Sequence, residues 1–300
     1  MALENIAIIL LSSLFHAVWN TLTQTSRNSL ILSGLKGIWI LVLACLVLPW
    51  LSIADLPDSL WLWVVLSGLF HGVYILSLSQ AYNTSDISYV YPIARSAPVF
   101  VPLFAWWFLG ERLPWTSWVA IVLILLAIYL LHFEGQLARG FRNLYDALRH
   151  RDLRWAFITL GLVVAYSLVD KWGMTLLGTF SPETPFKNGM TFFFLEALIG
   201  FTLCNVFIFR RYPASEIREV WKAERFKGLL AGLATIGSYG LICVVLQREP
   251  VSQVVALRQT SVLMVVLWGV FRLGEPFGKQ RLLAAGLIAL GVALMGWDPH

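Results

Sequence analysis

The sequence predicts an all-α integral membrane protein with ten transmembrane helices arranged as two inverted five-helix repeats. Composition is the first observation behind this prediction. Hydrophobic residues make up 58% of the 300 residues and charged residues only 13%, whereas soluble domains carry about 25% charge. Too few polar side chains remain to cover a soluble surface of this size. The second observation is the division of the chain into long apolar stretches, and the third is an internal repeat.

Ten apolar stretches approach the roughly 20 residues that a helix needs to cross the hydrocarbon layer. We expect spans near residues 3–24, 30–51, 60–82, 86–109, 115–133, 155–177, 187–209, 227–247, 251–273 and 279–297. Joints such as 83–86 and 110–114 are so short that the helices they connect must be antiparallel neighbours. The first stretch lacks a basic segment and a small-residue cleavage site, so we expect a retained helix rather than a signal peptide.

Two connections are longer and more charged than the others. Residues 136–154 are expected to form an amphipathic helix on the membrane surface, because apolar residues recur there at three- and four-residue spacing among arginines. This linker separates a first repeat at 1–135 from a second repeat at 155–300. The other connection, 210–227, alternates basic residues with glutamates and is expected to be a solvated connector.

The formal net charge of +5 does not indicate nucleic-acid binding, because the basic residues lie in short segments between apolar stretches without a basic-aromatic RNA motif. Most loop arginines and lysines lie on one predicted face of the membrane. The opposite face holds only Arg112, Lys187 and Arg248. By the positive-inside rule the first face is cytoplasmic, which places both termini outside the cytoplasm.

Motifs for cofactors, metals and catalysis are missing from the sequence. The three cysteines lie within apolar stretches and have no CxxC or Cys/His spacing, so we expect neither a disulfide nor a metal site. There is no Walker motif, GxGxxG, HExxH or GxSxG, which argues against ATP hydrolysis and the commonest hydrolase mechanisms. We therefore expect no cofactor and no enzyme activity.

The internal repeat has an offset of 164 residues. Gly110-Glu111 recurs as Gly274-Glu275, Ser88 matches Ser252, and Ala120 matches Ala284. Because five helices per repeat is an odd number, the second copy must be inverted relative to the first. Inverted repeats are common in transporters, which bind their ligands near the midplane between the two copies.

The end of each half resembles the EamA repeat of the drug/metabolite transporter superfamily. The segments are ISYVYPIARSAPVFVPLFAWWFLGE and VSQVVALRQTSVLMVVLWGVFRLGE, each followed by a helix rich in Gly, Ala and Leu, and the first helix carries HAVWN. The resemblance covers nearly the whole chain. It implies a multi-pass protein of the cell inner membrane, a monomer, that exports or exchanges small molecules. Ten-helix members are usually drawn with cytoplasmic termini, whereas the charge distribution here favours the opposite.

Ionisable groups inside spanning helices are costly unless they face a cavity or a partner, so they are default functional candidates. Arg95 and Arg258 lie on symmetry-related helices and would form a bidentate clamp for carboxylate or phosphate. The resemblance supports this hypothesis, because triose-phosphate translocators of the same superfamily carry basic residues on these helices. The structural alternative is that Arg95 binds carbonyls left unpaired by Pro92 and Pro98.

The spans contain more cations than anions. The cations are Lys36, Lys171 and the two arginines, and the anions are Asp170 and Glu196. An anion, water or backbone carbonyls must therefore offset the excess positive charge. Lys36 either contacts substrate or forms a buried ion pair with Glu196. Polar side chains also share helix faces. Such stripes include Ser67, His71 and Tyr74; Thr235 and Tyr239; Ser12, His16 and Asn20; and Tyr166 with Asp170.

The predicted substrate-binding residues are Asn20, Lys36, His71, Tyr74, Tyr91, Arg95, Tyr166, Asp170, Tyr239 and Arg258. In the family, helices 1, 3, 4, 6, 8 and 9 surround the central site. The leading hypothesis is a secondary transporter, an exporter or exchanger, of a small polar metabolite with an anionic group: an amino acid, an organic acid or a phosphorylated or phosphonate compound. The alternatives are a drug or organic-cation efflux transporter using Asp170 or Glu196, and a membrane enzyme or assembly factor. If protons are coupled, Asp170 and the histidines are their expected carriers.

Overall fold

The computed structural model describes residues 1–51, 53–84, 90, 93–133, 142, 145, 153–264 and 278–297. Residues 136–141, 143–144 and 146–152 of the predicted surface helix lie outside this part of the chain, so the linker stays a prediction. Tyr91 and the second Gly-Glu pair at 274–275 also lie outside it.

Helices fill the first half of the described chain. Their bounds are α1 at Leu3–Gln24, α2 at Ser29–Val47, η1 at Leu48–Trp50, η2 at Ile53–Asp55, α3 at Leu60–Thr84, α5 at Ala97–Leu109 and α6 at Trp115–His132. In the second half the bounds are α8 at Arg154–Phe180, α9 at Pro185–Arg211, α10 at Ala214–Thr235, η4 at Ile236–Gly240, α11 at Leu241–Leu246, α12 at Val251–Arg258 and α14 at Lys279–Gly296.

The prediction of an all-α membrane protein is confirmed. Seven helices of the described chain are long and apolar enough to cross a membrane, with α10, η4 and α11 counted as one span from Ala214 to Leu246. Two shorter apolar helices, α5 and α6, lie in the fourth and fifth predicted spans. The eight-residue α12 lies in the ninth. Each of the ten predicted spans therefore contains a helix.

The expected solvated connector at 210–227 is largely exposed but is not a loop. Helix α9 continues to Arg211, and α10 begins at Ala214. Most side chains in the first turns of α10 are exposed, as its charges require. A helix can extend beyond the hydrocarbon layer without an apolar pattern, because its backbone groups are paired within the helix wherever it lies.

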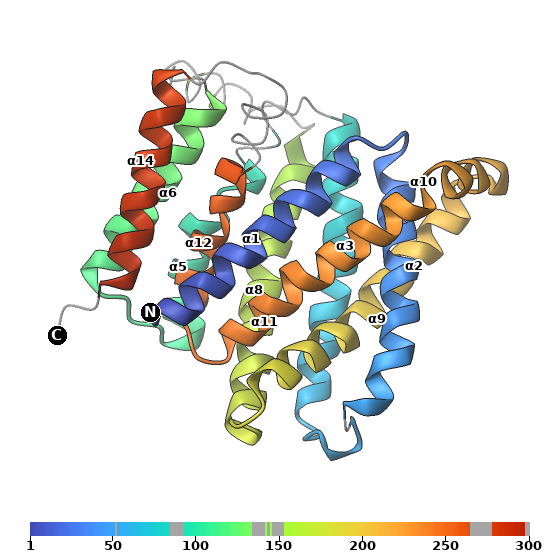
Figure 1. Cartoon of the computed structure of the whole chain (residues 1–300), viewed down its shortest axis with the longest axis horizontal. Coiled ribbons are helices and arrows are strands. Elements are labelled where there is room, and N and C mark those ends of the chain that lie inside the picture. The colour runs from blue at the N-terminus through green and yellow to red at the C-terminus, as the bar shows by residue number, and fades with distance from the viewer. Residues whose placement is uncertain are drawn as a thin grey trace.

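The helix contacts come in equivalent pairs when the two repeats are exchanged. Contacts of α3 with α8 and α9 correspond, under exchange of the repeats, to contacts of α10 and α11 with α1 and of α10 with α2. Three further contacts join equivalent helices: α2 with α9, α5 with α12, and α6 with α14. Figure 1 shows the α6 and α14 pair at one end of the bundle. This pattern agrees with two related five-helix repeats.

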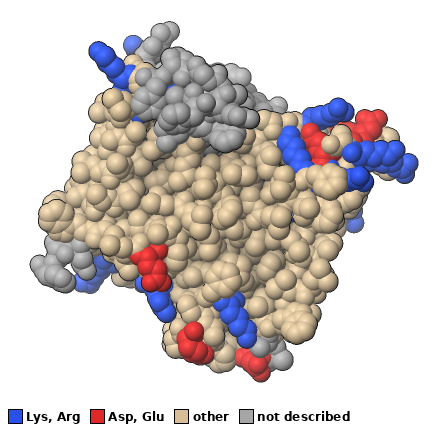
Figure 2. Space-filling model, in the orientation of Figure 1, with Lys and Arg blue, Asp and Glu red and all other residues tan. Residues whose placement is uncertain are grey.

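The surface has the polarity that a bilayer requires. Large apolar side chains such as Trp107, Leu46 and Phe209 are 78%, 63% and 58% exposed, which is unfavourable in water but not in lipid. Figure 2 shows Lys, Arg, Asp and Glu toward the edges of one face, with an uncharged middle. Glu196, Asp170 and Lys36 are instead buried inside the bundle.

The first Gly-Glu pair joins the two repeats. Gly110 has a φ of 66°, a left-handed conformation that ends α5 and that glycine adopts without strain. The next residue, Glu111, accepts hydrogen bonds from the backbone N–H groups of Val251 and Ser252 at 2.7 and 3.3 Å, and from the Ser252 hydroxyl at 2.7 Å. A carboxylate from the first repeat thus caps the N-terminus of α12 in the second.

Candidate functional site

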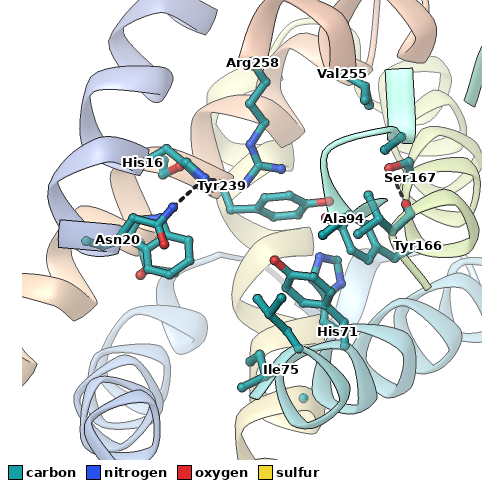
Figure 3. Close-up of a pocket in the computed structure, with 18 of the residues that line it drawn as sticks. His16, Asn20, His71, Ile75, Ala94, Tyr166, Ser167, Tyr239, Val255 and Arg258 are labelled. Carbon is teal, nitrogen blue, oxygen red and sulfur yellow. Dashed lines mark hydrogen bonds between the residues drawn. The ribbon is translucent and has the colours of Figure 1, made fainter. Parts of the chain in front are cut away.

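A cavity of about 150 Å³ lies between the two repeats (Figure 3). Eight of the ten predicted binding residues line it, namely Asn20, Lys36, His71, Tyr74, Arg95, Tyr166, Tyr239 and Arg258. Asp170 is fully buried behind Tyr239, whose hydroxyl donates to its carboxylate. Tyr91 lies outside the described residues. Lining residues also come from α2 and α9. These helices are the second and seventh predicted spans, which the expected set of central helices did not include.

Arg95 and Arg258 lie at helix breaks that occupy equivalent positions in the two repeats. Residues 95–96 form a turn before α5, and Gln259 forms a turn at the end of α12. In both turns the regular helix gives way to hydrogen bonds of shorter span, from the Ser96 N–H to the Ile93 carbonyl and from the Gln259 N–H to the Ala256 carbonyl. Broken helices at membrane depth occur where the chain lines a cavity. Both breaks lie at the cavity, since Arg95, Arg258 and Gln259 line it.

Arg95 contacts its own repeat equivalent. The offset of 164 residues pairs it with Gln259, and a terminal nitrogen of Arg95 donates to Oε1 of Gln259 at 3.1 Å. Arg258 lies on the symmetry-related helix, as expected, but the same offset pairs it with Ala94. Gln259 lines the cavity and was missed, although the repeat offset alone would have identified it.

Arg258 points into the cavity toward Tyr239 (Figure 3). A terminal guanidinium nitrogen lies 3.2 Å from Nδ1 of His16, and the guanidinium carbon lies 4.9 Å from the centre of the Tyr239 ring. Because a guanidinium only donates, Nδ1 of His16 accepts this hydrogen bond. Nε of Arg258 is buried and has no hydrogen-bond partner among the described residues. The residue thus keeps donor capacity inside the site.

A π-helix shapes the opposite wall. The helix from Ala214 to Leu246 changes to π geometry at Ile236–Gly240, and this widened turn carries Ser238 and Tyr239 into the cavity lining. The Ser12 hydroxyl on α1 donates to the Ser238 carbonyl at 2.7 Å. A neighbouring helix thereby binds a backbone oxygen of the irregular turn, as the bilayer interior requires. Such single π turns occur often at functional sites.

Close packing of α3 against α9 positions His71. A Cβ added to Gly68 would lie 2.7 Å from the Glu196 carbonyl oxygen, and one added to Gly72 would lie 2.9 Å from the Gly200 carbonyl oxygen. Only hydrogen on these α-carbons lets the two backbones approach so closely. As a result, Nδ1 of His71 lies 3.5 Å from a carboxylate oxygen of Glu196.

Aromatic rings surround His71. Tyr166 stacks on its imidazole with centroids 4.0 Å apart and an interplanar angle of 25°, and Tyr239 contacts it edge-on at 4.8 Å. Tyr74 packs edge-on against Tyr166 at 5.6 Å. These residues come from three different spans. Each ring restricts the orientation of the next, so the wall of the cavity is held in one arrangement.

Of the two alternatives for Lys36, the ion pair with Glu196 is not formed. Nζ of Lys36 lies 3.8 Å above the Trp19 ring, whereas the carboxylate of Glu196 faces His71. Lys171 does not belong to the cavity either. Its ammonium group donates to the carbonyl of Leu246, the last residue of α11, at 2.8 Å and to the carbonyl of Glu249 at 2.9 Å. Carbonyls left unpaired at a helix end thus offset this charge.

Other residues that line the cavity could not be predicted from the sequence, for a common reason. Trp19, Ser167 and Phe193 line the cavity but are ordinary residues of apolar spans. No charge or motif distinguishes them from their neighbours in the sequence. Among the described residues, no group of three or more His, Cys, Asp and Glu residues is arranged to hold a metal ion.

Comparisons with known proteins agree with this architecture. The sequence profile described as the EamA-like transporter family matches residues 4–133 and 153–297, one match for each repeat. A curated relative, "Uncharacterized transporter in cobO 3'region" from Sinorhizobium sp, is 32% identical over 75 residues, which are 25% of this chain. This chain covers only 53% of the length of that relative.

A solved structure described as "Crystal structure of protein" matches with a TM-score of 0.72 and 17% sequence identity. The match covers 98% of this chain and 97% of the solved one, and at this identity it shows a shared fold alone. Together with the ten helix-containing spans, the profile match shows a multi-pass transporter of the ten-helix membrane fold. The chain therefore belongs to the EamA-like transporter family.

Proposed function

We propose that the protein is a secondary transporter that moves a small polar metabolite with an anionic group by alternating access. The cations around the cavity carry this proposal. Lys36, Arg95 and Arg258 line it, against one acid on its wall, Glu196. A volume of about 150 Å³ is that of a cavity that holds benzene. The substrate is therefore the size of an amino acid, a small organic acid or a small phosphorylated compound.

The contacts of the two arginines support different roles. Arg95 is oriented by Gln259 and so presents its guanidinium from a fixed direction. The Arg258 guanidinium contacts His16, Tyr166 and the Tyr239 ring, and none of these side chains is an acid that would neutralise its charge. A carboxylate or phosphate provides two oxygens in the geometry that a guanidinium prefers. Arg258 is the residue that we expect to contact the substrate most directly.

Hydrogen bonds between the repeats support a rocking mechanism. Beyond the Glu111 cap on α12, the Gln253 side chain donates to the Ser117 hydroxyl at 2.6 Å, and the Asn5 side chain donates to Glu249 at 2.6 Å. All three lie where α12 begins, at the membrane face that also holds the start of α1. Opening the cavity toward that face would require breaking them. The excess of basic residues on the other face supports a cytoplasmic location for it, with both termini outside the cytoplasm.

Thermal stabilisation of the purified protein tests the proposal. The panel contains sulfate, lactate, glutamate and glycerol 3-phosphate as anionic or zwitterionic compounds, with choline and spermidine as cations. We expect anions to raise the melting temperature of the wild type. In Arg258→Gln the affinity falls by about tenfold or more, since a charge-assisted hydrogen bond is worth about 1.5–3 kcal/mol. Arg248→Gln is the matched control, because Arg248 is exposed and outside the cavity.

Glu196 favours one alternative, the binding of organic cations. Its carboxylate lines the cavity together with the aromatic rings of Trp19 and Tyr74, a combination that binds ammonium groups. Stabilisation by choline or spermidine alone, unaffected by Arg258→Gln and lost in Glu196→Gln, would replace the anion proposal with this one. Uptake of the stabilising compound into proteoliposomes, with and without a pH gradient, then tests transport itself.

A further inference from the structure

Two buried acids from different helices flank His71. We call His71, Asp170 and Glu196 the acid cluster. Nδ1 of His71 lies 3.0 Å from the Ser67 carbonyl oxygen and 3.5 Å from a Glu196 oxygen, and Nε2 lies 3.9 Å from an Asp170 oxygen. Because a carbonyl only accepts, Nδ1 carries a hydrogen and donates to Ser67. Nε2 is therefore the ring nitrogen that is able to take up a further proton.

Within the described part of the chain, His71 and Asp170 each have a polar atom without a hydrogen-bond partner. Nε2 of His71 and Oδ1 of Asp170 are buried and have no hydrogen-bond partner among the described residues. The Asp170 and Glu196 side chains are 0% and 4% exposed, so water does not stabilise their charges. Two ionised carboxylates beside a neutral imidazole would leave two negative charges in the protein interior. Such burial is costly unless partners or protons compensate it.

The groups that face the acid cluster connect it to the cavity. They are Tyr74 on α3, Tyr166 on α8, Tyr239 in η4, Cys243 on α11 and Arg258 on α12. Tyr239 forms the shortest connection. Its hydroxyl donates to Asp170, while the face of its ring contacts the Arg258 guanidinium. One side chain thus contacts both an acid of the cluster and the cation that we assign to the substrate.

We infer that the acid cluster binds one exchangeable proton, and that this proton binds together with the anionic substrate rather than in competition with it. The inference rests on the proposed function. A proton on Asp170, Glu196 or His71 removes one unit of negative charge beside Arg258. The positive field of Arg258 is then less compensated, so an anion binds more tightly. Because coupling between two sites is reciprocal, anion binding promotes proton uptake by the same factor.

This coupling has a definite sign for transport. Anion affinity increases by up to about tenfold for each unit that the pH falls, the limit for one linked proton. Proton and anion cross the membrane in the same direction. An inward proton gradient therefore drives uptake, and an outward gradient of the substrate exports protons with it. A carrier in which substrate and proton compete for one site would show the opposite sign.

Proton uptake measured with a pH indicator in weakly buffered nanodisc samples tests this inference. The added probes are sulfate and lactate, which do not titrate near neutral pH, and any other anion of the panel that stabilises the protein, corrected for its own titration. We expect uptake approaching one proton per bound anion at the pH where the cluster titrates. Asp170→Asn abolishes or strongly reduces this uptake, whereas Asp58→Asn, the removal of an exposed acid in a loop, leaves it unchanged.

Infrared difference spectra provide a second measurement that needs no ligand. The acid cluster is supported as the proton site if a protonated-carboxyl band gains intensity as the pH is lowered and is lost in Asp170→Asn or Glu196→Gln. An imidazole band that is lost in His71→Asn supports it equally. Anion binding with proton release, or without any proton exchange across the pH range, overturns the coupling while the proposed function stands. If no anion of the panel binds, the proposed function fails and this inference fails with it.

Discussion

The close contact between α3 and α9 can be tested with one methyl group. In Gly68→Ala the new Cβ would lie 2.7 Å from the Glu196 carbonyl oxygen and 2.6 Å from Cβ of Ile199. Neither atom is the end of a flexible side chain, so the clash cannot be relieved by a change of rotamer. The helices must separate by about 0.8 Å to restore an ordinary contact of 3.4 Å with both atoms.

The expected loss of stability follows from two opposing terms. Overpacking of this kind costs about 1–3 kcal/mol. Replacing glycine by alanine within a helix returns about 1 kcal/mol. The net destabilisation is thus up to about 2 kcal/mol, which corresponds to a fall in melting temperature of up to about 4–8 °C for a chain of this size. The same separation moves His71 away from Glu196, so anion binding and its proton uptake should weaken as well.

Thermal unfolding in one detergent provides the assay, and Gly161→Ala provides the control. Gly161 lies on α8, and a Cβ there would meet no atom within 4 Å. This variant should be as stable as the wild type or slightly more stable, because only the helix propensity changes. Equal melting temperatures for Gly68→Ala and Gly161→Ala would refute the argument that backbone contact between α3 and α9 sets the geometry of the site.

Three further predictions concern contacts outside this interface. Glu111→Ala removes the cap on α12 and should cost about 0.5–2 kcal/mol in thermal unfolding; an unchanged melting temperature would contradict the capping role. Lys171→Met leaves two carbonyls without their donor and should lower stability by about 1–3 kcal/mol while anion affinity is retained; lost affinity would place Lys171 in the site after all. Gln259→Glu places a carboxylate on Arg95 and should weaken anion binding by about tenfold in the stabilisation assay; tighter binding would argue against Arg95 as an anion ligand.

The membrane fold could be predicted from the sequence because its causes are local. Apolar length decides whether a segment crosses the bilayer, and a segment inside the bilayer must pair its own backbone groups, which makes it a helix. The segment at 210–227 shows what local sequence properties cannot decide. Its charges correctly indicated exposure to water, but exposure does not distinguish a loop from a helix that projects beyond the lipid.

The candidate site could be predicted in part. Charged and polar residues within apolar spans marked eight residues that line one cavity, because a polar group in lipid needs a polar environment. Their partners could not be predicted in the same way. The sequence left open whether Lys36 contacts substrate or pairs with Glu196, whereas in the structure its ammonium group lies over the Trp19 ring, and Lys171 binds carbonyls at a helix end. Composition gives the charges inside a bundle without saying which of them meet.

The sequence by itself determined that this protein lies in a membrane. It also determined the approximate positions of the helices, the repeat offset and the residue types available to a central site. Those properties depend on each segment and its immediate surroundings. Tertiary structure alone decided that Arg95 meets Gln259, that His71 lies between Glu196 and Asp170, and that a π turn carries Tyr239 to Arg258. The physical reason is that helices in lipid gain no hydrophobic energy from one rotation over another, so close packing between glycines and buried hydrogen bonds far apart in sequence fix how each helix faces its neighbours.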